Sequence, residues 1–331
     1  MSISAKASMV NLTRSNIKKS VDFFGESSSE DTQSILARRF TYAKSIDSLE
    51  GHYFGFYALR TILRAIFMSI NYQIAGHHSL SKKYLAPSTV LFYTSAYHAI
   101  HGYQALHGRV LSDLNWRADT SDDRNPASKK SLRHRLVLGV LTKSNAWKFE
   151  PRYASHSSVW RELSQVFASS KFEVPKYFDD FFNFLYRGQF EGYENMADAV
   201  LEPDKYRYKL SDHIEEFLER ISDLRHFAIY ESTGVEPGLV DAMVDGSPYS
   251  IDAIPRQCEE FGLFSYRLLE DVTKQARAIV EEIRPNREVR EALFVEVLLD
   301  HFDEPDIDAY GDRETAKDVR FLWNWLRMCE N

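Results

Sequence analysis

Hydrophobic residues recur at every third or fourth position along residues 209–230, which is the spacing of one face of an α-helix. The series consists of Leu210, Ile214, Phe217, Ile221, Leu224 and Ala228. The opposite face carries ionisable or hydrogen-bonding side chains, namely Glu215, Glu219, Asp223, His226 and Tyr230, and Arg225 lies on the border. A helix that only faces solvent does not need a row of ionisable side chains along one face. We therefore expect the apolar face to pack in a core and the polar face to line a groove or an interface.

The same periodicity predicts helices along most of the chain. They are expected over about 27–48, 52–75, 84–106, 131–141, 157–170, 175–187, 209–230 and 250–283, with two more between 287 and 330. Residues 76–81 are expected to break the chain, and residues 1–26 are interpreted as a poorly structured or loosely docked arm. We find no alternating strand pattern of any length. The pattern therefore predicts an all-α protein, a helical bundle with extra helices at both ends.

The expected helix at 52–75 is apolar almost all round, with one polar seam. Arg60, Arg64 and Asn71 fall on that line. Arginines in such a position pair with carboxylates of a neighbouring helix, or they bind a phosphate group or a partner. The second interpretation makes Arg60 and Arg64 a candidate nucleotide or ligand site.

Composition favours a globular protein with long elements and few turns, because the 331 residues include only 14 glycines and 10 prolines. The longest apolar run, residues 53–75, is interrupted by arginines and is a poor membrane span. The N-terminal stretch lacks the apolar core of a signal peptide. Two cysteines far apart, Cys258 and Cys329, suit a reducing compartment. We therefore expect a cytoplasmic protein without a membrane partner.

Charge is divided unevenly along the chain. Residues 1–170 hold 22 Lys and Arg against 12 Asp and Glu, whereas residues 171–331 hold 19 against 36. This asymmetry indicates either mutual attraction of the two halves or an anionic partner for the first half.

A basic stretch with interleaved aromatic residues lies in the first half. Its cations around Trp116 are Arg117, Arg124, Lys129, Lys130, Arg133 and Arg135, and Lys143, Trp147, Lys148 and Arg152 continue it. Single-stranded nucleic acids need cations for phosphates and rings for base stacking. Four aspartates in the loop at 112–130 dilute the charge. The stretch is therefore either an RNA contact or a solvated mixed-charge loop.

Two short motifs resemble the HEPN group of helical domains. The first is a tyrosine-rich helix, whose matching residues are Tyr93, Ala96, Tyr97, His98, Ala99, Ala105 and Leu106. The second is an Arg-x-x-Ala-x-Tyr helix ending, matched by Arg225, Ala228 and Tyr230 and followed by a last helix containing Ala276, Ala278 and Val280. The resemblance covers roughly residues 52–283, with inserted material around 112–205.

The resemblance implies a four- or five-helix bundle that often dimerises through the helix bearing the arginine motif. Catalytic members are metal-independent ribonucleases that use an arginine, a polar neighbour and a histidine. In this chain Tyr230 stands in the usual place of the histidine, and His226 takes the polar-neighbour position. The implied catalytic residues are then Arg225, His226 and Tyr230.

The sequence contains few motifs for metal binding, phosphate binding or nucleophilic catalysis. His98 and His101 are one helical turn apart, but no acidic residue joins them on that helix. No Gly-rich phosphate loop or nucleophile elbow is present. We expect no metal and no cofactor.

The sequence therefore predicts an N-terminal arm and helix over 1–50, a HEPN-like bundle over 51–285 and a C-terminal helical extension over 286–331. The leading hypothesis is a protein of a nucleic-acid-linked stress or defence process, acting as a homodimer or with a protein partner, with metal-independent RNA cleavage as its candidate activity. The alternatives are a non-catalytic interaction or oligomerisation module and a helical nucleotide or ligand binder.

Overall fold

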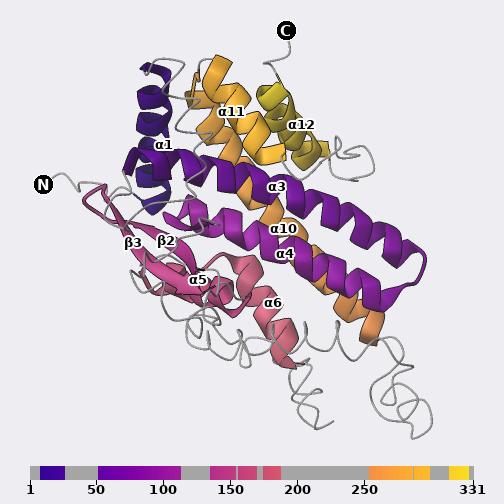
Figure 1. Cartoon of the computed structure of the whole chain (residues 1–331). Helices are drawn as coiled ribbons and strands as arrows, with labels where there is room; N and C mark the ends of the chain where they lie inside the picture. The colour runs from indigo at the N-terminus through magenta and orange to yellow at the C-terminus, as the bar shows by residue number, and fades with distance from the viewer. Residues whose placement is uncertain are drawn as a thin grey trace, which may run out of the picture. The chain divides into compact units, whose positions relative to one another are not determined.

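The structure is a computed structural model, and it describes residues 8–26, 51–112, 135–153, 156–169, 174–187, 253–285, 287–298 and 313–327. Within these ranges the chain forms eight helices and one small three-stranded sheet (Figure 1). The predicted all-α class is therefore confirmed, with the sheet as an addition to it. No described helix is long and apolar enough to cross a membrane.

The helices are α1 (Met9–Glu26), α3 (Gly51–Ser81), α4 (Leu85–Leu106), α5 (His156–Ser169), α6 (Lys176–Arg187), α10 (Ala253–Glu282), α11 (Arg287–Leu298) and α12 (Arg313–Arg327). The helices expected at 84–106, 157–170, 175–187 and 250–283 are confirmed as α4, α5, α6 and α10, and the two expected near the C-terminus as α11 and α12. The helices expected at 27–48 and 209–230 lie outside the described residues.

The described residues fall into two compact units. Unit 1 takes 8–26, 51–68, 98–112, 135–153, 156–162, 270–285, 287–298 and 313–327, and unit 2 takes 69–97, 163–169, 174–187 and 253–269. The helices α3, α4, α5 and α10 each contribute residues to both units.

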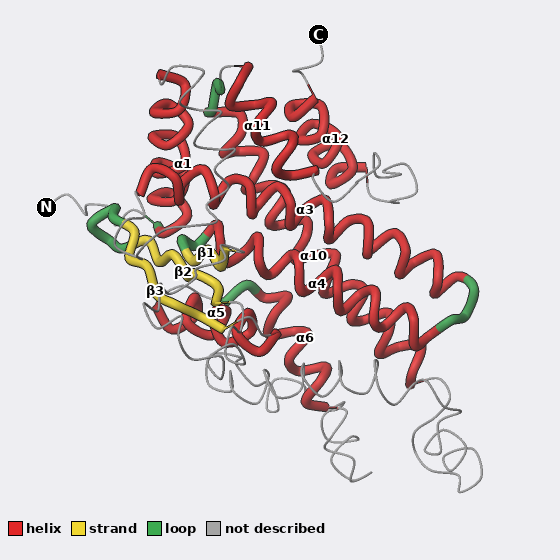
Figure 2. The backbone as a smooth tube through the Cα atoms, viewed as in Figure 1, coloured by secondary structure: helices red, strands yellow, loops and turns green. Residues whose placement is uncertain are grey.

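Unit 1 contains the sheet, whose strands are β1 (Arg109–Ser112), β2 (Arg135–Leu141) and β3 (Trp147–Tyr153) (Figure 2). The strands are antiparallel in the order β1-β2-β3. The prediction of a helix over 131–141, and of a chain without strands, was wrong. An apolar run such as that of β2 has no alternation, so periodicity alone does not separate a buried strand from a helix.

The helix α1 covers residues 9–26, so the interpretation of residues 1–26 as a poorly structured or loosely docked arm was wrong for this helix. Ile17, Val21 and Phe24 are fully buried at helical spacing on α1. The indole N–H of Trp147 donates to Asn16 Oδ1 at 2.7 Å, which ties α1 to β3. In the same unit α1 packs on α11, and α11 packs on α12 (Figure 1).

The helix α3 continues to Ser81, so the break predicted at 76–81 was wrong. Gly76 serves packing there, because a Cβ on it would come within 2.6 Å of the Phe92 ring in α4. The turn that follows contains Lys83 with a φ of 63°. At the far end of α4, Gly108 has a φ of 73°, as expected for a glycine that ends a helix.

Unit 2 has an aromatic core. The rings of Phe181 in α6 and Phe264 in α10 stack with centroids 4.2 Å apart, and Phe261 stacks on Phe181 at 5.2 Å. A buried serine cluster joins three helices: Ser69 and Ser95 are linked Oγ to Oγ at 2.9 Å, and Ser265 Oγ donates to Ser95 Oγ at 2.7 Å. The small serines bring α3, α4 and α10 close together within this unit.

Candidate functional site

Most of the predicted site residues lie outside the described part of the chain. This applies to Arg225, His226 and Tyr230, and to Trp116, Arg117, Arg124, Lys129, Lys130 and Arg133. Arg135 begins β2 and pairs in register with Tyr153, but its side chain is not described. Trp147, from the continuation of the basic stretch, is buried and hydrogen-bonded to Asn16, so its ring does not offer a face for base stacking.

The polar seam of α3 is partly buried in unit 1. The Arg60 side chain is only 7% exposed, and its guanidinium carbon lies 4.8 Å from the centroid of the Tyr57 ring. Arg64 is half-buried one turn later. Both arginines make further contacts in the structure. Because a cation packed on a ring within a core is stabilised there, this environment favours a structural role for Arg60.

The residues of the tyrosine-rich motif lie on α4 and are mostly buried. Ala96, Ala99 and Ala105 have no exposed surface. In unit 2 the Tyr93 ring stacks with Tyr97 at a centroid distance of 6.4 Å and tilts against Phe261 of α10 at 6.1 Å. Small and aromatic residues at these positions therefore serve helix packing.

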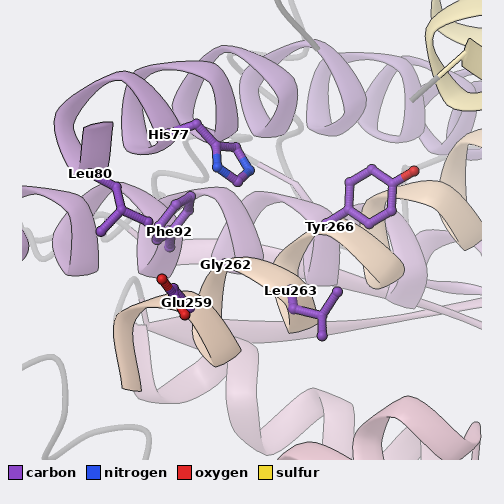
Figure 3. A pocket seen from close by; sticks show the side chains of 7 residues that line it. All are labelled: His77, Leu80, Phe92, Glu259, Gly262, Leu263 and Tyr266. Atoms are coloured by element: carbon purple, nitrogen blue, oxygen red, sulfur yellow. The ribbon is translucent and has the colours of Figure 1, made fainter. Parts of the chain in front are cut away.

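A groove in unit 2 brings ionisable and aromatic side chains together (Figure 3). Its volume is about 330 Å³, and its lining comes from α3, α4 and α10. The lining residues are His77, Leu80, Phe92, Glu259, Gly262, Leu263 and Tyr266. We refer to this feature as the His77 groove.

The groove owes its shape to Phe92 and two glycines. Phe92 is fully buried, and a Cβ on Gly262 would lie 3.0 Å from its ring, tighter than ordinary contact. With Gly76 on the other helix, both α3 and α10 approach the ring closely. The His77 ring meets Phe92 edge to face at 5.1 Å.

A buried amide orients the histidine. Gln73, fully buried one turn before His77, donates from Nε2 to the carbonyl oxygen of Gly262 at 2.9 Å. The same Nε2 lies 3.2 Å from His77 Nε2, which must therefore accept, so the imidazole carries its proton on Nδ1. Partial burial lowers the pKa of His77, which also favours the neutral ring.

The carboxylate of Glu259 is exposed at the groove and makes no ion pair or hydrogen bond with any described residue. The neighbouring Cys258 is buried. Burial raises the pKa of the Cys258 thiol and outweighs the hydrogen bonds from Thr89 and Ser88. Because the thiolate is the nucleophile, Cys258 is not poised for covalent chemistry.

A second group of titratable residues lies in unit 1, at the end of α4. Burial lowers the pKa of His107 to about 4. Burial, aided by the charge of Asp271, raises the pKa of Tyr103 well above its usual range. The two rings lie 4.6 Å apart. Both groups are held neutral near pH 7, so they act as packed hydrogen-bonding side chains rather than as an acid and base pair.

Next to them, Arg109 of β1 forms a buried ion pair with Glu162 of α5. Arg109 Nε donates to Glu162 Oε2 at 2.9 Å, and the Glu162 side chain is only 2% exposed. Because breaking such a pair leaves an uncompensated buried charge, it holds β1 and α5 together.

Sequence reasoning missed the His77 groove, although the four-residue spacing of Gln73 and His77 was visible. The groove depends on the close approach of Gly262 to Phe92. These residues are distant in sequence, so no local pattern predicts their contact. Among the described side chains, no three His, Cys, Asp or Glu residues cluster as a metal site would require. Comparison of the chain with protein-family models, with curated proteins and with solved structures found no match.

Proposed function

We propose that this chain is a HEPN-like helical protein that acts in a nucleic-acid-linked stress or defence process and cleaves RNA without a metal ion. The observation that carries the proposal is the burial of the motif residues on α4. Tyr93 and Ala96 are buried, and Tyr93 contacts Phe261 of α10. The resemblance implies a helical bundle, and these contacts place the tyrosine-rich helix in the packing of such a bundle.

The reaction would depend on the polar face of residues 209–230. His226 takes the proton of a ribose 2′-hydroxyl, and the 2′-oxygen attacks the adjacent phosphorus. Arg225 stabilises the charge that develops on the phosphoryl oxygens. Tyr230 returns a proton to the departing 5′-oxygen, which leaves a 2′,3′-cyclic phosphate and a free 5′-hydroxyl.

The substrate would approach along the basic stretch. Its cations, Arg117, Arg124, Lys129, Lys130, Arg133 and Arg135, bind phosphates, and Trp116 stacks on a base. On the described hairpin the exposed Lys143 and Lys148 extend the same positive charge.

Labelled RNA incubated with the purified chain in EDTA tests the proposal. We expect cleavage with 2′,3′-cyclic phosphate ends, and a loss of about 100-fold or more in the Arg225→Ala/His226→Ala variant. The matched control replaces Arg220 and His213, which are the same residue types outside the motif, and is expected to cleave like the parent. RNA left intact by the parent chain would remove the proposal.

The second candidate function is a non-catalytic interaction or oligomerisation module. Tyr230 in the usual place of the histidine favours it, because a phenol with a pKa of about 10 is a poorer proton donor than a group near 7. In this case the polar face of residues 209–230 forms a subunit interface and Tyr230 is a structural hydrogen-bonding group.

A further inference from the structure

The His77 groove in unit 2 is an open surface groove lined by apolar, aromatic and ionisable side chains. Its volume of about 330 Å³ lies at the lower end of the range for ligand pockets. Leu80, Phe92 and Leu263 provide apolar walls, and the rings of His77 and Tyr266 add to them (Figure 3). The groove therefore suits a compact apolar or aromatic body.

One ionised group faces this apolar lining. Among the described residues that line the groove, Glu259 is the only one with a carboxylate. It makes no ion pair or hydrogen bond within the described part of the chain, and neither Lys82 nor Lys83 of the neighbouring turn pairs with it. Within the described part of the chain, no cation competes with a ligand for this carboxylate.

The histidine does not neutralise that charge. Gln73 uses its Nε2 to bridge the Gly262 carbonyl oxygen and His77 Nε2. If His77 were protonated, its Nε2–H would point at the N–H of Gln73, and two donors would face each other. The contact with Gln73 therefore favours the neutral form of the imidazole. The lining thus combines a single negative charge with neutral rings.

From this combination we propose that the His77 groove binds a small organic cation, an amine or guanidine carried on an apolar or aromatic body. Glu259 pairs with the cation, and the Tyr266 ring, two turns further along α10, contacts the body of the ligand. Leu80 and Leu263 contact the apolar part of the ligand, above the buried Phe92 ring. An anionic ligand is repelled by the same carboxylate. The proposal does not rest on RNA cleavage, and either stands if the other fails.

Two probes of nearly equal size distinguish the contribution of the ligand's charge to binding from the contribution of its shape. Benzylammonium carries the cation and the ring, and benzyl alcohol carries the ring alone. Saturation-transfer NMR on the full chain measures the binding of each probe. We expect millimolar affinity for benzylammonium, as its few atoms allow, and weaker binding of benzyl alcohol.

Two glutamine variants locate the site. Glu259→Gln keeps the shape of the side chain and removes its charge, and we expect it to weaken benzylammonium about three- to fivefold, the effect of an exposed ion pair. Benzyl alcohol binding is expected to stay unchanged. Glu260→Gln removes the adjacent carboxylate, which does not line the groove, and is expected to bind both probes like the parent.

Both variants change a solvent-accessible carboxylate with no partner in the described structure, so circular dichroism is expected to show an intact fold. A three- to fivefold weakening of benzylammonium binding in Glu259→Gln, but not in Glu260→Gln, supports the proposal. Equal binding of the two probes, an equal effect of the two variants, or no saturation transfer to either probe overturns it.

Discussion

His107 is held neutral by its surroundings at the end of α4, and this makes it a pH-dependent element of unit 1. Burial lowers its pKa from 6.5 to about 4. The unfolded chain therefore binds a proton below pH 6.5 that the folded chain does not bind until near pH 4. The stability that the neutral ring contributes is fully present above pH 6.5 and is lost as the pH falls through that window.

The variant His107→Gln removes this titration. We expect the parent to lose up to about 2 kcal/mol more free energy of unfolding than the variant between pH 7 and pH 5. Tryptophan fluorescence during urea unfolding measures it, because Trp147, Trp160, Trp323 and Trp325 all belong to unit 1.

The control for this measurement is His78→Gln, which changes an exposed ring on α3. It is expected to retain the acid sensitivity of the parent. If His107→Gln and His78→Gln respond alike to pH, the assignment of the acid sensitivity to His107 is incorrect.

At this scale the sequence predicts local pairs better than distant ones. Gln73 and His77 are one turn apart, so their contact follows from helix geometry. The contact of Phe92 with Gly262 and the ion pair of Arg109 with Glu162 join distant segments, and nothing in either segment alone specifies the partner. The candidate groove depends on the first of these contacts, between Phe92 and Gly262, which is why it was not predicted.

The strand β2 shows why one element was predicted wrongly. Leu138 and Leu141 are buried, and Gly139 lies between them against the ring of Phe54 from α3. A strand with such a buried run has no alternating pattern and resembles a short buried helix in sequence. The pairing of β2 with β1 and β3 and the contact of Phe54 with Gly139 are tertiary, so the local pattern does not contain them.

This contact gives a prediction at the element scale. In Gly139→Ala the added Cβ would overlap the ring of Phe54, and we expect a loss of about 1–3 kcal/mol in the stability of unit 1 from overpacking. Urea unfolding followed by tryptophan fluorescence measures the loss. Val140→Ala, at the next and partly exposed position, is the control and is expected to lose less.

A second-site change tests the cause of that loss. Phe54→Leu removes the ring that the added Cβ would strike, so Gly139→Ala is expected to cost less in that background than in the parent. Equal costs in both backgrounds would show that the Phe54 ring is not the reason for glycine at this position.

Long helices were the most predictable elements. The patterns at 84–106 and 250–283 give α4 and α10 with ends close to those expected, because many turns repeat the same signal. The helix α1 was missed although Ile17, Val21 and Phe24 have helical spacing, since so short an apolar stripe in a polar segment carries little signal until a partner buries it.

For the whole molecule, packing does not follow chain order. Each unit gathers segments that are distant in sequence, and α3, α4, α5 and α10 each contribute residues to both. The division of the chain at residues 50 and 285 stays a prediction from the pattern along the chain. Topology of this kind arises from long-range contacts that no local pattern encodes.

For the whole molecule we predict self-association. Both the proposed ribonuclease and the alternative interaction module place the polar face of residues 209–230 against a second subunit or a partner. We expect light scattering to give twice the chain mass of 38.4 kDa at high concentration. Charge reversal on that face, Glu215→Lys with Glu219→Lys, is expected to shift the equilibrium toward the monomer.

The control reverses charge at an exposed turn instead, through Lys82→Glu with Lys83→Glu, and is expected to leave the mass unchanged. A monomer at every concentration would contradict a homodimer, and RNA cleavage by that monomer would require each polar face to work without a second copy. Association unaffected by the two glutamate substitutions would instead place the interface elsewhere on the chain.

Because ionic contacts at an exposed interface weaken with salt, association through this face is also expected to decrease as ionic strength rises.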